Sequence, residues 1–122
     1  MTNAEKTQGQ QGSSEDLVAK IKTARDEALD KANDNMNLAT KRERYESLRA
    51  ITAVATYNEV LSMIEWGGTG HRVPDMATEA TADFERARDG ETTGMTLAVT
   101  HGRRDALATV AEWMNNKESW AS

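Results

Sequence analysis

The stretch TKRERYESLRAITAVATYNEVLSMIEWGG, residues 40–68, decides the fold of this chain. Thr40 followed three residues later by Glu43 is a capping box, a pattern that marks the start of a helix. Trp66-Gly67-Gly68 marks its end, because glycine readily takes the left-handed conformation that terminates helices. Apolar residues recur at helical spacing between these signals, so the sequence predicts a helix at the centre of the core. Its apolar face comprises Ala50, Val54, Tyr57, Leu61 and Ile64, widened by Leu48, Ile51, Val60 and Met63.

The segment before this helix predicts a thinner helix that starts near Ser13. Its apolar face is mostly alanine and therefore buries little area: Leu17, Ile21, Ala24, Ala28 and Ala32. Residues 33–37 (NDNMN) interrupt the pattern, and Asn and Asp favour non-helical backbone, so we expect a turn or kink there. A single continuous helix over 14–66 is the alternative. Residues 1–13 are polar and predict a flexible, disordered tail.

Two further helices are expected after the glycines. Pro74 suits the first turn of a third helix, which Asp89-Gly90 closes. Its apolar stripe is Met76, Ala80, Phe84 and Ala87, and that of the last helix is Met95, Val99, Gly102, Ala106, Val110 and Trp113. Residues 95–100 could instead form a strand, but a lone strand would lack a partner. We therefore predict an all-α fold of three or four helices in antiparallel hairpins or a small bundle, with one domain over 14–118 and a frayed end at 119–122.

Composition narrows the class of protein. Only 17 of the 122 residues are Val, Ile, Leu or Phe, whereas 18 are Ala, which indicates a folded but core-poor helical domain. The net charge of −5 argues against non-specific binding to nucleic acid. The absence of cysteine excludes disulfides and thiolate sites. Neither a membrane span nor a secretory signal is recognisable, so we expect a cytoplasmic protein, in the host cell's cytoplasm if it is phage-encoded.

Catalytic and metal-binding motifs are missing. His71 and His101 lie 30 residues apart and neither has a Glu three positions before it, so no zinc or di-metal pattern arises. Neither a nucleophile elbow nor a phosphate loop occurs. Asp26, Glu27 and Asp30 could hold Mg²⁺, but Lys22, Arg25 and Lys31 beside them favour a solvated helix face. We therefore expect no enzyme, cofactor or metal.

Three sets of residues are candidates for binding. A glycine-rich loop with two cationic side chains could cradle a phosphate or carboxylate: Gly67, Gly68, Gly70, His71 and Arg72. A short connection between helices is the plainer explanation of these glycines. Acidic residues repeat every four positions on the third helix and could face a basic partner: Asp75, Glu79 and Asp83. Such residues also stabilise a helix N-terminus without any ligand.

Aromatic residues supply the third set. Trp113 and Trp120 lie seven residues apart near the C-terminus and could anchor a partner, although Trp113 also fits the core stripe. Tyr45 lies in a basic segment, Lys41–Arg49. The acids Glu43 and Glu46 are interleaved there, so we interpret the segment as salt-bridged helix surface. This interpretation argues against nucleic acid as a partner.

These patterns favour a small, non-enzymatic helical protein for protein–protein interaction or assembly. It would complete its thin core by forming a homo-oligomer or by binding another protein. The alternative is an acidic inhibitor protein whose third helix occupies a nucleic-acid-binding or basic protein surface. Small acidic helical chains of this kind are common among phage and other viral or mobile-element products, so we expect such an origin by class alone.

Overall fold

A computed structural model describes the backbone of residues 2–34, 40–90 and 93–121, and the side chains of 15–34, 40–90 and 93–115. These parts form four α-helices and no strand, which confirms the all-α prediction. The helices are α1 (Thr2–Asp34), α2 (Lys41–Ser62), α3 (Val73–Asp89) and α4 (Gly94–Ala121). A π-helical turn (Met63–Gly67) and a 3₁₀ turn (Gly70–Arg72) join α2 to α3. No helix in the described part of the chain is long and apolar enough to cross a membrane.

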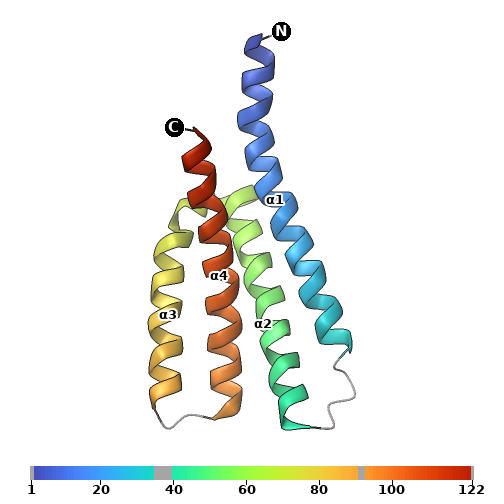
Figure 1. Cartoon of the computed structure of the whole chain (residues 1–122), viewed down its shortest axis with the longest axis vertical. Coiled ribbons are helices and arrows are strands. Elements are labelled where there is room, and N and C mark those ends of the chain that lie inside the picture. The colour runs from blue at the N-terminus through green and yellow to red at the C-terminus, as the bar shows by residue number, and fades with distance from the viewer. Residues whose placement is uncertain (1, 35–39, 91–92, 122) are drawn as a thin grey trace.

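The four helices lie side by side in the order α3, α4, α2, α1 (Figure 1). Helices α1 and α2 form one antiparallel hairpin, and α3 and α4 form the other, as the sequence predicted. Because α3 returns the chain to the lower end of the molecule, α2 and α4 become parallel neighbours. The seam between α2 and α4 therefore joins the two hairpins.

Local sequence signals set the helix ends. The Thr40 hydroxyl accepts a hydrogen bond from the Glu43 amide at 3.1 Å and donates one to the Glu43 carboxylate at 2.9 Å, so the predicted cap is confirmed. Gly68 ends the π-helical turn in the left-handed conformation, with φ of 61°. Pro74 lies in the first turn of α3. Helix α1 ends at Asp34 and α2 starts at Lys41, so residues 14–66 contain two helices.

The two ends of the chain are helical over a longer range than the sequence pattern indicated. Helix α1 begins at Thr2, upstream of Ser13, and α4 continues to Ala121. The side chains of residues 1–14 and 116–122 lie outside the described part. The predictions of a flexible tail over 1–13 and a frayed end over 119–122 stay predictions.

Small residues form the seam between α2 and α4. Ala98, Gly102 and Ala106 follow one another at intervals of four residues on α4, and all three are buried. A Cβ atom on Gly102 would lie 2.4 Å from the carbonyl oxygen of Arg49 and 3.1 Å from Cβ of Thr52. The two helix backbones therefore approach closely, and this approach leaves little room for large side chains between them.

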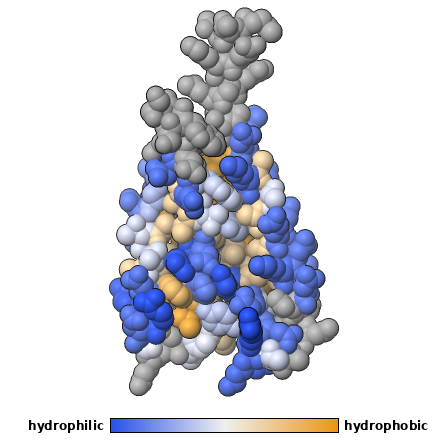
Figure 2. Space-filling view, in the orientation of Figure 1, coloured by the Kyte–Doolittle hydropathy of each residue, from blue (hydrophilic) through white to orange (hydrophobic). Residues whose placement is uncertain are grey.

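A compact group of larger side chains completes the core above this seam. The five largest fully buried side chains come from all four helices: Ile21, Val60, Val73, Leu107 and Val110. The predicted face of α2 is buried at Ala50, Tyr57 and Leu61. The front of the molecule is mainly hydrophilic, with small hydrophobic patches (Figure 2). The core is thus small, as the composition predicted.

Three predicted core positions are wrong. Met95 is 70% exposed, Ile51 is 53% exposed and Val99 is 39% exposed. Ala98, which lies between Met95 and Val99, is fully buried, so the buried face of α4 runs through Ala98, Gly102 and Ala106 and leaves Met95 and Val99 to one side of it. Periodicity identifies the residues on one face of a helix and does not show how far the partner helix covers that face.

The close approach at Gly102 predicts the effect of a methyl group. Gly102→Ala should lower the free energy of unfolding by about 1–3 kcal/mol, because the new Cβ would clash with the backbone of Arg49. Gly94→Ala is the control, because nothing lies within 4 Å of a Cβ there. Chemical denaturation of both variants measures the difference. Equal stability of Gly102→Ala and the native chain would contradict the close seam.

Candidate functional site

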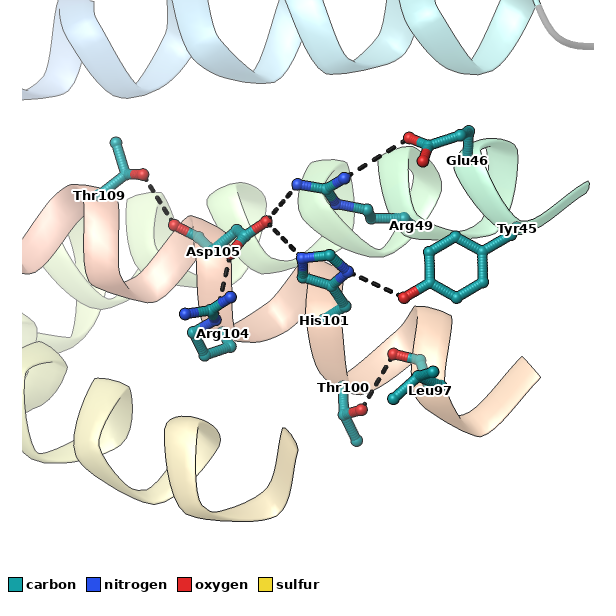
Figure 3. A network of polar contacts seen from close by, with 9 residues as sticks. All are labelled: Tyr45, Glu46, Arg49, Leu97, Thr100, His101, Arg104, Asp105 and Thr109. Atoms are coloured by element: carbon teal, nitrogen blue, oxygen red, sulfur yellow. Dashed lines mark hydrogen bonds and ion pairs between the residues drawn. The ribbon is translucent and has the colours of Figure 1, made fainter. Parts of the chain in front are cut away.

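A network of polar side chains connects α2 and α4 beside Gly102 (Figure 3). The Tyr45 hydroxyl lies 2.9 Å from Nδ1 of His101, and Nε2 of His101 lies 3.3 Å from the Asp105 carboxylate. Asp105 also pairs with Arg49 of α2 and, at 3.1 Å, with Arg104. One imidazole and one carboxylate on α4 therefore hold two side chains of α2.

The partners of His101 determine its tautomer. A carboxylate only accepts hydrogen bonds, so Nε2 carries the hydrogen that faces Asp105. Nδ1 then accepts a hydrogen bond from the Tyr45 hydroxyl. Burial raises the pKa of Tyr45 above 10.0, so the phenol keeps the proton that it donates. Each polar atom of the neutral imidazole thus has a matching partner.

The surroundings of His101 favour this neutral form. Burial is the largest influence and lowers the pKa of His101 below 6.5. Asp105 raises that pKa, whereas the cations Arg49 and Arg104 lower it. The ring of Phe84 on α3 lies 4.8 Å from the imidazole, centre to centre, and 4.7 Å from the guanidinium carbon of Arg104. The network thereby extends to a third helix, which favours a structural role for it.

The sequence indicated only part of this network. The segment Lys41–Arg49, predicted as salt-bridged surface, contains an ion pair between Glu46 and Arg49 at 3.5 Å. Tyr45 and Asp105 were not linked to His101, and the pair Tyr45–His101 spans 56 residues of sequence. A contact between residues so far apart in sequence leaves no periodic pattern that could reveal it.

The candidate anion-binding loop uses its own backbone groups. The amides of Gly68 and Thr69 both donate to the Met63 carbonyl, the second at 3.1 Å. The Arg72 amide donates to the Thr69 carbonyl at 3.0 Å, and Val73 donates to Gly70. These four donors are thus engaged within the loop, which supports the plainer explanation of its glycines. Anion binding there stays a prediction.

Two glycines of this loop, Gly68 and Gly70, are required by the backbone conformation and by packing. Gly68 supplies the positive φ described above. A Cβ on Gly70 would lie 2.9 Å from Cγ1 of Ile64. Glycine at this position therefore lets the 3₁₀ turn pack against the π-helical turn that follows α2. The cationic side chains His71 and Arg72 are both exposed.

The acidic stripe lies on the surface of α3. Asp75, Glu79 and Asp83 are all exposed, as a partner-binding stripe requires. Asp83 forms an ion pair with Arg86 one turn further along the helix. The structure therefore brings the three carboxylates together on one face of α3. Their contact with a basic partner stays a prediction.

The tryptophans differ in their surroundings. Trp113 is half-buried against the core, and the Lys20 ammonium lies 5.8 Å from the centre of its ring. The side chain of Trp120 lies outside the described residues. Trp66, which the sequence places at the end of the central helix, is 86% exposed. Its place immediately before two glycines was the signal that could have identified it as a surface residue.

A groove runs between α3 and α4 on the face shown in Figure 2, where pale and tan surface separates the hydrophilic side chains. Its volume is about 830 Å³. Small side chains account for most of its walls, which are lined by Pro74, Ala77, Thr78, Thr81, Ala82 and Glu85 of α3 and by Ala108, Ala111, Glu112, Met114 and Asn115 of α4. The groove exists because alanine and threonine do not fill the space between the two helices.

The described residues contain no group of three His, Cys, Asp or Glu side chains that could hold a metal ion. Asp26 of the candidate magnesium cluster pairs instead with Arg25, at 3.2 Å. No protein family, curated protein or solved structure matches this chain.

The His101 network predicts a specific pH dependence of stability. The pKa of His101 is lower in the folded chain than its unfolded value of 6.5, so the unfolded chain takes up the proton first as the pH falls. The contribution of His101 to the free energy of unfolding is full above pH 6.5 and decreases as the pH falls below 6.5 toward the folded pKa. Urea unfolding at a series of pH values measures this loss.

Two histidine variants isolate the effect. His101→Gln should remove the loss of stability just below pH 6.5, whereas replacing the other histidine, His71→Gln, should leave it unchanged. His71 is exposed and lies outside the network. The same loss in His101→Gln as in the native chain would show that another group is responsible.

Proposed function

We propose that this chain is a non-enzymatic protein–protein interaction protein that holds an amphipathic helix of a partner in the α3–α4 groove. The observation that supports the proposal is the groove itself, an open hollow of about 830 Å³ with mostly apolar walls. Apolar grooves between helices are a common way of binding a partner helix. We also propose that the protein acts in the cytoplasm.

The shortage of large side chains explains why a partner would bind there. Ala77, Ala82, Ala108 and Ala111 form the walls of the groove, and none of them reaches across it. Larger side chains on a partner helix would fill this space and bury the exposed methyl groups. Binding would thus complete the core that the chain leaves unfinished.

The charges around the groove define the partner's chemistry. Glu85 and Glu112 line opposite sides of it, and no Lys or Arg is among its lining residues. The acidic stripe lies on the same helix as Glu85, on the neighbouring face. A partner helix with an apolar face flanked by lysine or arginine therefore fits best.

The exposed acidic stripe supports a second candidate function. Asp75, Glu79 and Asp83 present three carboxylates at regular intervals along one exposed helix face. Such a row would suit an inhibitor that occupies a nucleic-acid-binding or basic protein surface. In this case the stripe, and not the groove, would contact the partner.

Two matched variants distinguish the groove from the stripe. Glu85→Lys/Glu112→Lys reverses the groove charges, and Glu79→Lys/Asp83→Lys reverses the stripe charges. Both change the net charge by the same amount, and all four side chains are exposed, so we expect both variants to fold. Each serves as bait in extracts of the native source, beside the unmodified chain, and retained proteins are identified by mass spectrometry.

The groove proposal predicts a partner that the unmodified chain and the stripe variant retain and the groove variant loses. A groove filled by Ala108→Trp should lose the same partner without any change in charge. The reverse pattern would support the acidic inhibitor. Equal retention by all the variants would contradict both functions, and circular dichroism confirms that each bait is folded.

A further inference from the structure

A second apolar surface lies on α2, away from the groove. Leu48, Ile51 and Ala55 follow one another at helical spacing on one side of α2. Ile51 is 53% exposed, Ala55 is exposed and Leu48 is half-buried. This side of the helix is distinct from the buried face, and the bundle covers it only in part, at Leu48.

The neighbouring side of α4 extends this surface. Arg103 of α4 and Glu59 of α2 form an ion pair at 3.1 Å, which shows that these two positions lie on the same side of the helix pair. One turn earlier on each of the two parallel helices lie Val99 and Ala55. Val99 and Met95 are the apolar residues of α4 that the sequence placed in the core and that the structure leaves exposed. They continue the exposed apolar surface of α2.

We propose that this α2–α4 surface is a self-association interface, on which a second copy of the chain packs with its α2 antiparallel to the first. It lies apart from the proposed binding groove, and neither site needs the other. Exposed apolar residues that cluster on one surface are typical of interaction sites. A homodimer related by a twofold axis places the same surface on both copies.

The charges at the two ends of the surface select a second copy as the occupant. Arg44 lies seven residues before Ile51, and Glu59 lies eight residues after it. These separations correspond to about 10 Å and 12 Å along a helix. An antiparallel copy centred near Ile51 therefore places its Glu59 opposite Arg44 and its Arg44 opposite Glu59. Both side chains are exposed, and each also takes part in an interaction within its own chain; for Glu59 this is the ion pair with Arg103, which leaves it 45% exposed.

The net charge of the chain does not oppose this contact. The acidic stripe lies on α3, at the opposite edge of the helix order from α1 (Figure 1), whereas the proposed twofold axis runs beside α2, between the two copies. At the interface itself, Arg44 and Arg103 accompany Glu59. Two copies would therefore meet through apolar side chains and paired opposite charges.

Sedimentation equilibrium over a series of concentrations tests the interface. The unmodified chain should dimerise, and Ile51→Glu should raise the dissociation constant of the dimer at least about tenfold, because it places two carboxylates at the twofold axis. Leu29→Glu is the matched control, since Leu29 is a comparably exposed apolar residue on α1 and should have no effect. A native chain that stays monomeric at every concentration would overturn the proposal.

A charge exchange tests the antiparallel arrangement. Arg44→Glu and Glu59→Arg should each weaken the dimer, because each places like charges together, and the double variant should restore it. Dimerisation that is as strong in both single variants as in the unmodified chain would overturn this arrangement. A monomeric chain that still retains a partner through the α3–α4 groove would overturn the dimer and leave the proposed function intact.

Discussion

The structure depends on the approach of α4 to the backbone of α2 at Gly102. No side chain other than hydrogen fits there, since a Cβ would lie 2.4 Å from the Arg49 carbonyl oxygen. Ala98 and Ala106, one turn to each side, are also buried, so the whole contact is made by small residues. A chain with only 17 Val, Ile, Leu and Phe residues can fold because its central helices lie so close that methyl groups and backbone atoms fill the space between them.

The polar groups beside this seam add directional contacts where apolar area is scarce. His101 and Asp105 flank Gly102 on α4 and hold Tyr45 and Arg49 of α2. Hydrogen bonds and ion pairs require defined geometry, whereas small apolar surfaces can slide past one another. The network therefore fixes the register of the two parallel helices, and Phe84 covers it from α3.

Local chemistry made much of the fold predictable. Thr40, Gly68 and Pro74 act on the backbone within a few residues, and the sequence placed the corresponding helix ends correctly. The exposure of Ile51 and Met95 was not predictable, because it depends on which part of each helix face the neighbouring helices cover. The groove and the His101 network were missed for the same reason: both arise between helices that are distant in sequence, and no spacing rule describes their relative placement.

The parallel arrangement of α2 and α4 has a consequence for how the chain reaches its structure. The α1–α2 and α3–α4 pairs are consecutive in sequence and close only short loops, whereas the Tyr45–His101 contact spans 56 residues. Contacts of low sequence separation form more readily. We therefore expect folding to proceed as the assembly of two helical hairpins. The seam between α2 and α4 would form last, and its formation would limit the rate of folding.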